Sequence, residues 1–178
     1  MNNKLRKLVS AAMFAAFICV ATLLIQIPSP MGGYINFGDC FILASAWVLG
    51  PVYGFAAGGI GSALADLISG YAQYVPGTLV IKGLIAVSAA VISKRILTAA
   101  PSKKLLAYTS GAVTGELIMI IGYALYDGLI FGSGFFAALC GVGNIVQGVC
   151  GAAAGIALIR ALSAAGVTRK VHAYAEIF

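Results

Sequence analysis

The chain consists mostly of long apolar runs that contain no charged side chain. No Asp, Glu, Lys or Arg occurs between Lys7 and Asp39, for example. Only 9% of all residues are charged, whereas a soluble domain carries about 25%. This number of charged residues is too small to keep the surface of a soluble domain hydrated. Lipid must therefore surround much of this chain. We therefore expect one integral membrane domain and no separate soluble domain.

Breaks at proline and glycine divide the apolar residues into six segments. A bilayer core about 30 Å thick takes about 20 apolar residues in a helix, and fewer where the bilayer is locally thin. The pattern predicts an all-α bundle of six transmembrane helices. The expected helices cover 8–27, 40–50, 53–71, 77–93, 105–127 and 136–162, followed by a cytoplasmic tail over 163–178. The second segment is short for a span.

Basic residues outside the apolar segments indicate the orientation, because Lys and Arg accumulate on the cytoplasmic side of membrane proteins. They form three clusters: Lys4, Arg6 and Lys7; Lys94, Arg95, Lys103 and Lys104; and Arg160, Arg169 and Lys170. Six helices place all three clusters on one side, whereas five or seven would divide them. We expect both termini in the cytoplasm of a bacterial-type cell with the chain in its plasma membrane. The net charge of +6 is then a topology signal, and we expect no nucleic-acid partner.

Polar residues at membrane depth are the candidate site, because burying them in lipid is costly unless they serve a function. Helical spacing places Glu116, Tyr123 and Asp127 on one face of a helix. With six helices, the polar groups converge on the outward-facing half, where four acids face one lysine. Such a negative cup suits a small ligand with ring nitrogens or hydroxyl donors. The expected ligand-binding residues are Tyr34, Asn36, Asp39, Asp66, Tyr74, Lys82, Glu116, Tyr123, Asp127, Asn144 and Gln147. The alternative is that Lys82 pairs with the acids and the amides join the helices.

Other functions need features that the sequence does not offer. A stand-alone carrier or channel for a small cationic or polar solute needs a polar path across the membrane. The inner halves of the expected helices are nearly all Ala, Gly, Val, Ile and Leu. The four cysteines have no metal-binding spacing, and no reaction-like group of side chains stands near Glu116. We expect no enzyme activity, no cofactor and no metal.

Small residues recur at a spacing of four and favour close helix packing. On the first helix they form two pairs, Ala11 with Ala15 and Ala12 with Ala16, near the basic N-terminus. These pairs either pack inside the bundle or provide a docking face for another membrane helix.

Four stretches together resemble the substrate-binding S components of energy-coupling factor (ECF) vitamin transporters. They are the alanine pairs, the Gly-Tyr-Ile-Asn-Phe-Gly-Asp of 33–39, the Gly-Ser-Ala-Leu-Ala-Asp-Leu of 61–67 continuing through Tyr71 and Pro76 to Lys82-Gly83, and the Asn-x-x-Gln-Gly of 144–148. The resemblance covers nearly the whole chain. Its second and third stretches are most similar to S components for pyridoxine-type or hydroxymethylpyrimidine-type vitamins, a group that includes members labelled as riboflavin transporters.

The resemblance implies a six-helix protein that captures a micronutrient outside the cell. The alanine pairs would dock on a transmembrane coupling protein, and two cytoplasmic ATPases would drive release by toppling the S component in the membrane. The sequence contains no Gly-x-x-x-x-Gly-Lys-Ser/Thr, so ATP hydrolysis must come from partners. The expected ligand is a pyridoxine-type or hydroxymethylpyrimidine-type heterocycle, with riboflavin or another heterocyclic micronutrient as the alternative.

Overall fold

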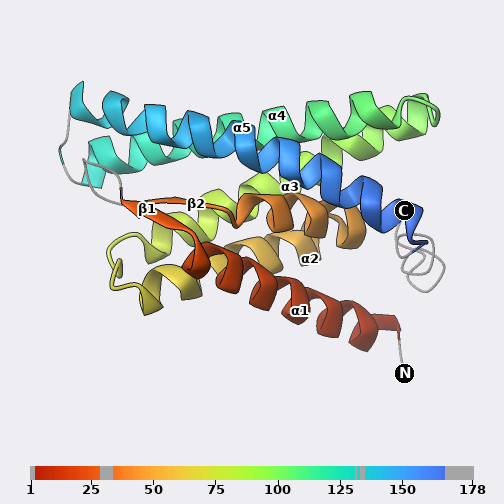
Figure 1. The fold of residues 1–178 in the computed structure, drawn as a ribbon, viewed down its shortest axis with the longest axis horizontal. Helices are drawn as coiled ribbons and strands as arrows, with labels where there is room; N and C mark the ends of the chain where they lie inside the picture. Colours follow the sequence, from red (N-terminus) through yellow and green to blue (C-terminus); the bar gives the residue numbers. More distant parts are fainter. Residues whose placement is uncertain (1–2, 29–33, 131, 133–134, 167–178) are drawn as a thin grey trace.

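The chain folds into helices that lie side by side along one long axis, with a short β-hairpin at one end (Figure 1). The computed structural model describes residues 3–28, 34–130, 132 and 135–166. Its elements are α1 (Asn3–Leu24), β1 (Gln26–Pro28), β2 (Tyr34–Asn36), α2 (Asp39–Ile68), α3 (Val75–Ala99), α4 (Lys104–Ile130) and α5 (Phe135–Ala164). Within the expected tail, 163–178, the end of α5 is described and 167–178 lie outside the described residues.

Helix α2 reverses its direction at Gly50. This residue has φ 81° and ψ −179°, a conformation that glycine adopts without steric cost, and Pro51 then starts the second segment at a position where proline is favoured. A Cβ on Gly58 would lie 3.1 Å from the side chain of Ile42, although one straight helix would hold these residues about 24 Å apart. Helix α2 therefore consists of two helical segments, 39–49 and 51–68, packed against each other in opposite directions.

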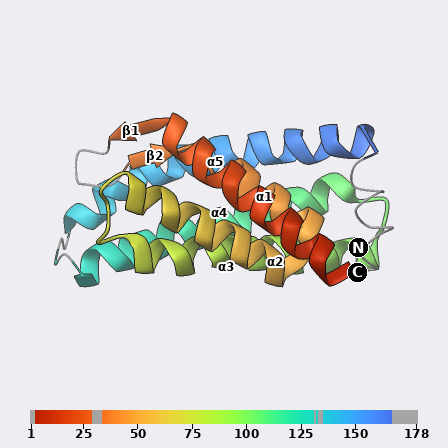
Figure 2. The ribbon, with the colours of Figure 1, turned by 90° about the horizontal axis from the view of Figure 1, so that it is seen from below.

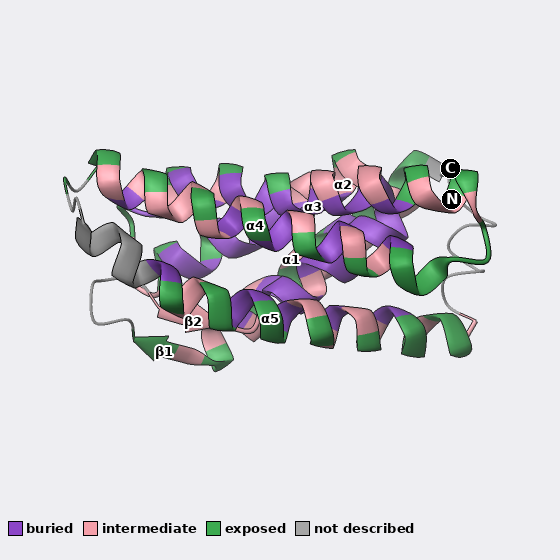
Figure 3. Ribbon diagram, turned by 90° about the horizontal axis from the view of Figure 1, so that it is seen from above, coloured by how far each residue is buried: buried purple, intermediate pink, exposed green. Residues whose placement is uncertain are grey.

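Five helices in the described part of the chain are long and apolar enough to cross a membrane. The candidate spans are Lys4–Leu24, Asp39–Ile68, Val75–Ala99, Lys104–Ile130 and Gly141–Ala164. Buried residues lie where the helices face one another, and exposed residues face outward (Figure 3). Many of the exposed side chains are large and apolar, as lipid contact requires. The prediction of an all-helical membrane bundle is confirmed, apart from the short hairpin.

Two of the predicted helices end earlier in the structure than expected. Helix α1 stops at Leu24, short of the expected residue 27, because β1 pairs antiparallel with β2, with Gln26 opposite Asn36. Helix α2 stops at Ile68, short of the expected residue 71. There Gly70 has φ 83°, and the Tyr71 amide donates to the Asp66 carbonyl at 2.8 Å. This is the glycine-terminated helix end that a positive φ permits.

Small residues bring the helices into close contact, as lipid-embedded packing requires. A Cβ on Gly61 would meet the backbone of Ala15, so α1 and α2 touch nearly backbone to backbone. Gly111 lies equally close to Ala89 and joins α4 to α3. The small residues around Gly61 and Gly111 thus pack inside the bundle.

The two ends of the bundle differ in character. At the hairpin end lie β1, β2 and the connection between α2 and α3. At the other end α1 begins, α5 ends and α3 connects to α4 (Figure 2). We call the latter the basic end, because the described members of all three basic clusters belong to its segments.

Candidate ligand-binding site

A buried ion pair between Lys82 and Asp39 forms the centre of the candidate site. The Lys82 Nζ donates to Asp39 Oδ1 at 2.5 Å, and the two side chains are 2% and 0% exposed. The ammonium also lies 3.2 Å from the sulfur of Met119 and 5.7 Å from the ring centre of Tyr123. The pair joins the start of α2 to α3 and neutralises the one lysine at this depth among the described residues.

Gln147 connects this ion pair to the hairpin. Its Nε2 donates to Asp39 Oδ2 at 2.6 Å, and its Oε1 accepts from the backbone amide of Asn36 at 2.8 Å. The Asn36 side chain turns instead to the Gly38 amide, whose hydrogen bond it accepts at 3.0 Å. One glutamine on α5 therefore fixes the positions of α2 and β2 together.

Glu116 is a buried acid beside this network. It is 5% exposed, and neither carboxylate oxygen has a hydrogen-bond donor within the described part of the chain. A Cβ on Gly151 of α5 would lie 2.8 Å from Asp39 Cβ and 3.4 Å from Glu116 Oε1. Glycines at 148 and 151 thus give the two carboxyl side chains room against α5. An acid so placed is costly unless a donor reaches it.

Helices α3 and α4 run in opposite directions. Near the hairpin end, polar side chains of the two helices face each other. Thr78 is four residues before Lys82 and so lies on the same face of α3. Its hydroxyl is 2.9 Å from the hydroxyl of Tyr123 on α4. This second polar level lies one helical turn nearer the hairpin end than the ion pair.

Four tyrosines gather at the hairpin end of the bundle. The ring centres are 4.9 Å apart for Tyr34 and Tyr71, 6.3 Å for Tyr71 and Tyr74, and 6.0 Å for Tyr74 and Tyr126. These spacings fit aromatic stacking. The cluster offers flat apolar faces with polar tips.

The hydroxyl of Tyr34 donates to Asp66 Oδ1 at 2.6 Å. Burial raises the pKa of Tyr34 above its ordinary value, and the neighbouring Asp66 raises it further. The hydroxyl therefore keeps its proton at neutral pH and remains a donor to this buried acid.

The predicted site residues thus fall into two neighbouring groups. The ion-pair group contains Asn36, Asp39, Lys82, Glu116, Tyr123 and Gln147, and the hairpin-end group contains Tyr34, Asp66, Tyr74 and Asp127. Asn144 is half-buried on α5, three residues from Gln147 toward the hairpin end.

Comparison with known proteins assigns the family. The model of the family described as "ECF-type riboflavin transporter, S component" matches residues 2–164. The chain belongs to this family of S components. It is also 41% identical over 135 residues to a protein of Pyrococcus woesei that is described as "Uncharacterized protein in gap 3'region"; the match covers 75% of this chain and 86% of that protein. The resemblance to the S components of ECF transporters is confirmed, and the protein is a multi-pass membrane component of a transport system.

The alanine pairs of this S component lie beside an apolar groove between α1 and α2. The groove has a volume of about 510 Å³, and all four alanines line it. Ala11 is only 5% exposed, and the backbone of Ala15 touches Gly61. Ala12 and Ala16 are exposed. The first pair therefore packs on α2, and the second pair faces outward.

Two residues of the site were missed by the sequence analysis: Met119, which contacts the ion pair, and Thr78, which lies one helical turn nearer the hairpin end. Each had a signal in the helical spacing, since Thr78 is four residues before Lys82 and Met119 is three after Glu116. Neither is charged, so neither stands out in an apolar helix. The sulfur of Met119 contacts both Lys82 and Gln147, at 3.2 and 3.3 Å.

Proposed function

We propose that this S component captures a small water-soluble vitamin or vitamin precursor from outside the cell for import by an ECF-type transporter. The observation that carries the proposal is Glu116, a buried carboxyl group whose two oxygens have no hydrogen-bond partner among the described residues. A ligand with N–H or O–H groups supplies the missing donors. A site built to hydrogen-bond such groups rejects analogues that lack them.

The chemistry of the site supports a pyridoxine-type or hydroxymethylpyrimidine-type nitrogen heterocycle as the ligand. Lys82 already forms an ion pair with Asp39. Among the described residues at this depth, no other lysine or arginine is therefore placed to bind an anionic group of a ligand. The tyrosine cluster offers its ring faces to a planar heterocycle. Riboflavin is the second candidate, because the description of the matching family names it.

Each of the predicted residues has a role in this proposal. Glu116 and Asn144 face the donors and acceptors of the ligand, and Tyr123 lies beside its ring. Gln147, whose amide is already bonded to Asp39 and to the Asn36 amide, holds the site together. Asp39 and Lys82 hold the floor of the site. Tyr34, Asn36, Asp66, Tyr74 and Asp127 form its hairpin-end wall.

The proposed topology has six passes, with the two segments of α2 counted separately. The basic end then faces the cytoplasm, in agreement with the accumulation of Lys and Arg there, and the hairpin end faces outward. Both termini are cytoplasmic, and the membrane is the plasma membrane. The segment 39–49 is short for a span. Its residues from 42 to 49 are all buried, so other helices enclose it.

The transport partners follow from the same proposal. A transmembrane coupling protein docks on the outward-facing alanines, Ala12 and Ala16, and two cytoplasmic ATPases supply the energy. The groove beside these alanines is lined almost wholly by apolar side chains, so a partner helix with small residues can approach it closely.

Replacing Glu116 by alanine should weaken vitamin binding by roughly 1–3 kcal/mol, the cost of leaving a buried partner unsatisfied. The dissociation constant would rise about 5- to 150-fold. Titration calorimetry of the purified protein with pyridoxine, or with whichever B vitamin the wild type binds, measures this change. The matched control is Leu117→Ala, because Leu117 is the next residue on α4 and is 50% exposed. Equal affinity of E116A and the wild type would move the site away from Glu116.

A further inference from the structure

Two adjoining hollows lie at the basic end of the bundle, around Lys94 of α3. One has a volume of about 310 Å³ and reaches Trp47 and Tyr108. The other has a volume of about 650 Å³ and reaches Pro51 and Arg95. Ala90, Lys94 and Thr98 line both. The two hollows therefore form one groove along the end of α3, which we call the Lys94 groove.

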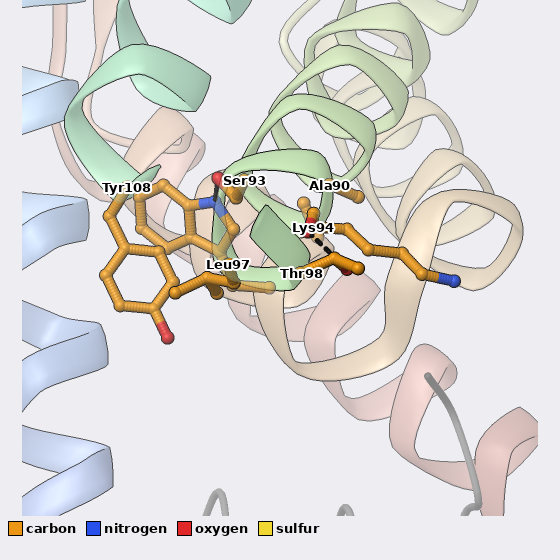
Figure 4. Close-up of a pocket in the computed structure, with 8 residues that line it drawn as sticks. Ala90, Ser93, Lys94, Leu97, Thr98 and Tyr108 are labelled. Atoms are coloured by element: carbon orange, nitrogen blue, oxygen red, sulfur yellow. Dashed lines mark hydrogen bonds between the residues drawn. The ribbon is translucent and has the colours of Figure 1, made fainter. Parts of the chain in front are cut away.

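Hydrogen bonds and ring contacts fix the aromatic side of the Lys94 groove. The indole Nε1 of Trp47 donates to Ser93 Oγ at 2.9 Å, and this hydroxyl donates to the carbonyl of Ala107, also at 2.9 Å. The rings of Trp47 and Tyr108 are 4.9 Å apart and tilted by 50°. Figure 4 shows Ser93, Tyr108 and Leu97 along the same wall. This wall is preformed, because α2, α3 and α4 all hold it.

The other side of the Lys94 groove combines positive charge with apolar surface. Lys94 and Arg95 are both exposed, and the ammonium of Lys94 extends away from Tyr108 (Figure 4). Pro51, Ala90 and Val91 line the same hollow. The hydroxyl of Thr98 is bonded to the backbone carbonyl of Lys94 at 2.9 Å. The cations at this site therefore border a surface that suits hydrocarbon.

We propose that the Lys94 groove binds an anionic phospholipid. The phosphate lies at Lys94 and Arg95, and the start of an acyl chain lies along Pro51, Ala90 and Val91. Basic pockets between membrane helices bind anionic head groups in this way, and each basic side chain near the membrane surface adds attraction. The aromatic wall fits the same boundary, because Trp and Tyr favour the level of the head groups. This site is separate from the vitamin site at the other end of α3 and does not depend on it.

Native mass spectrometry of the detergent-solubilised protein tests the proposal. The probes are dioleoylphosphatidylglycerol and dioleoylphosphatidylcholine, which share their acyl chains and differ in net charge. We expect the wild type to retain the anionic lipid with a preference of roughly tenfold or more, since two basic residues contribute. The double variant K94Q/R95Q should lose this preference. The matched control K103Q/K104Q removes two exposed charges from the same end, outside the groove, and should keep it.

Three results with the lipid probes would overturn this lipid site. They are equal retention of the two lipids by the wild type, an unchanged preference in K94Q/R95Q, and an equal loss in K103Q/K104Q. Displacement of the anionic lipid by an equal concentration of inorganic phosphate would also contradict it, because the acyl chain would then contribute nothing. Since the comparison of lipids on the wild type needs no variant, poor folding of K94Q/R95Q would not prevent the test.

Discussion

Replacing Lys82 by methionine should lower the free energy of unfolding by about 3–5 kcal/mol, the cost of breaking a buried ion pair by removing one partner. The Asp39 carboxylate would keep its bond from Gln147 but lose its buried cation. Methionine fills similar space, so little of the loss would come from a cavity. Unfolding of the purified protein in mixed micelles with increasing dodecyl sulfate measures the change.

The double variant D39N/K82M separates the charge from the packing. Asparagine can still accept from Gln147 and leaves no uncompensated charge, so the double variant should regain most of the lost stability. The matched control is Lys104→Met, since Lys104 is exposed at the start of α4 and should change stability by about 0.5 kcal/mol or less. A double variant whose destabilisation equals the sum of D39N and K82M would show that the two residues are not coupled.

Replacing both Ala12 and Ala16 by tryptophan should abolish vitamin uptake and leave vitamin binding unchanged. Both alanines are exposed and line the apolar groove on α1 and α2. Two indole rings would hold a partner helix away from a surface where close approach provides the binding energy. Uptake of labelled vitamin by cells that also produce the coupling protein and the ATPases measures the effect. Binding is measured on the purified variant.

Two further variants show whether the position matters. V113W/L117W places the same rings four residues apart on the exposed face of α4 and should leave uptake intact. A11L/A15L changes the pair that faces α2 and should reduce stability, because the backbone of Ala15 touches Gly61. Normal uptake by A12W/A16W would exclude this docking surface. Loss of binding together with uptake would assign these alanines to internal packing.

The fold was predictable where a single segment decides the structure. Apolar length predicts the helices, and glycine and alanine at a spacing of four favour close helix packing, although the partners, such as Gly61 with Ala15, come from the structure. The hairpin was not predictable in this way, because three-residue strands carry too short a pattern and depend on pairing with each other. The sequence predicts a helix break at Gly50-Pro51. The antiparallel packing of the two flanking segments was not predictable, because it depends on contacts such as that between Gly58 and Ile42, which lie far apart along the chain.

The sequence predicts which polar residues form the site, but it does not predict which of them pair with one another. Buried polar residues are rare in this chain, so selecting them from the sequence was straightforward. Four acids were available to Lys82, and its pairing with Asp39 depends on the register between α2 and α3, which lies beyond local sequence. The alanine pairs show the same limit. Neighbouring helix positions differ by about 100° in direction, so the packing of α1 on α2 decides that Ala11 is covered and Ala12 is exposed.

Binding of B vitamins to the purified chain alone, without ATP or partners, tests the central claim most directly. Titration calorimetry in detergent would cover pyridoxine, hydroxymethylpyrimidine, riboflavin and the other B vitamins, with a melting curve to show that the protein is folded. We predict that one heterocyclic vitamin binds to a single site and that E116A binds it more weakly. A folded protein that binds none of these vitamins would contradict the account.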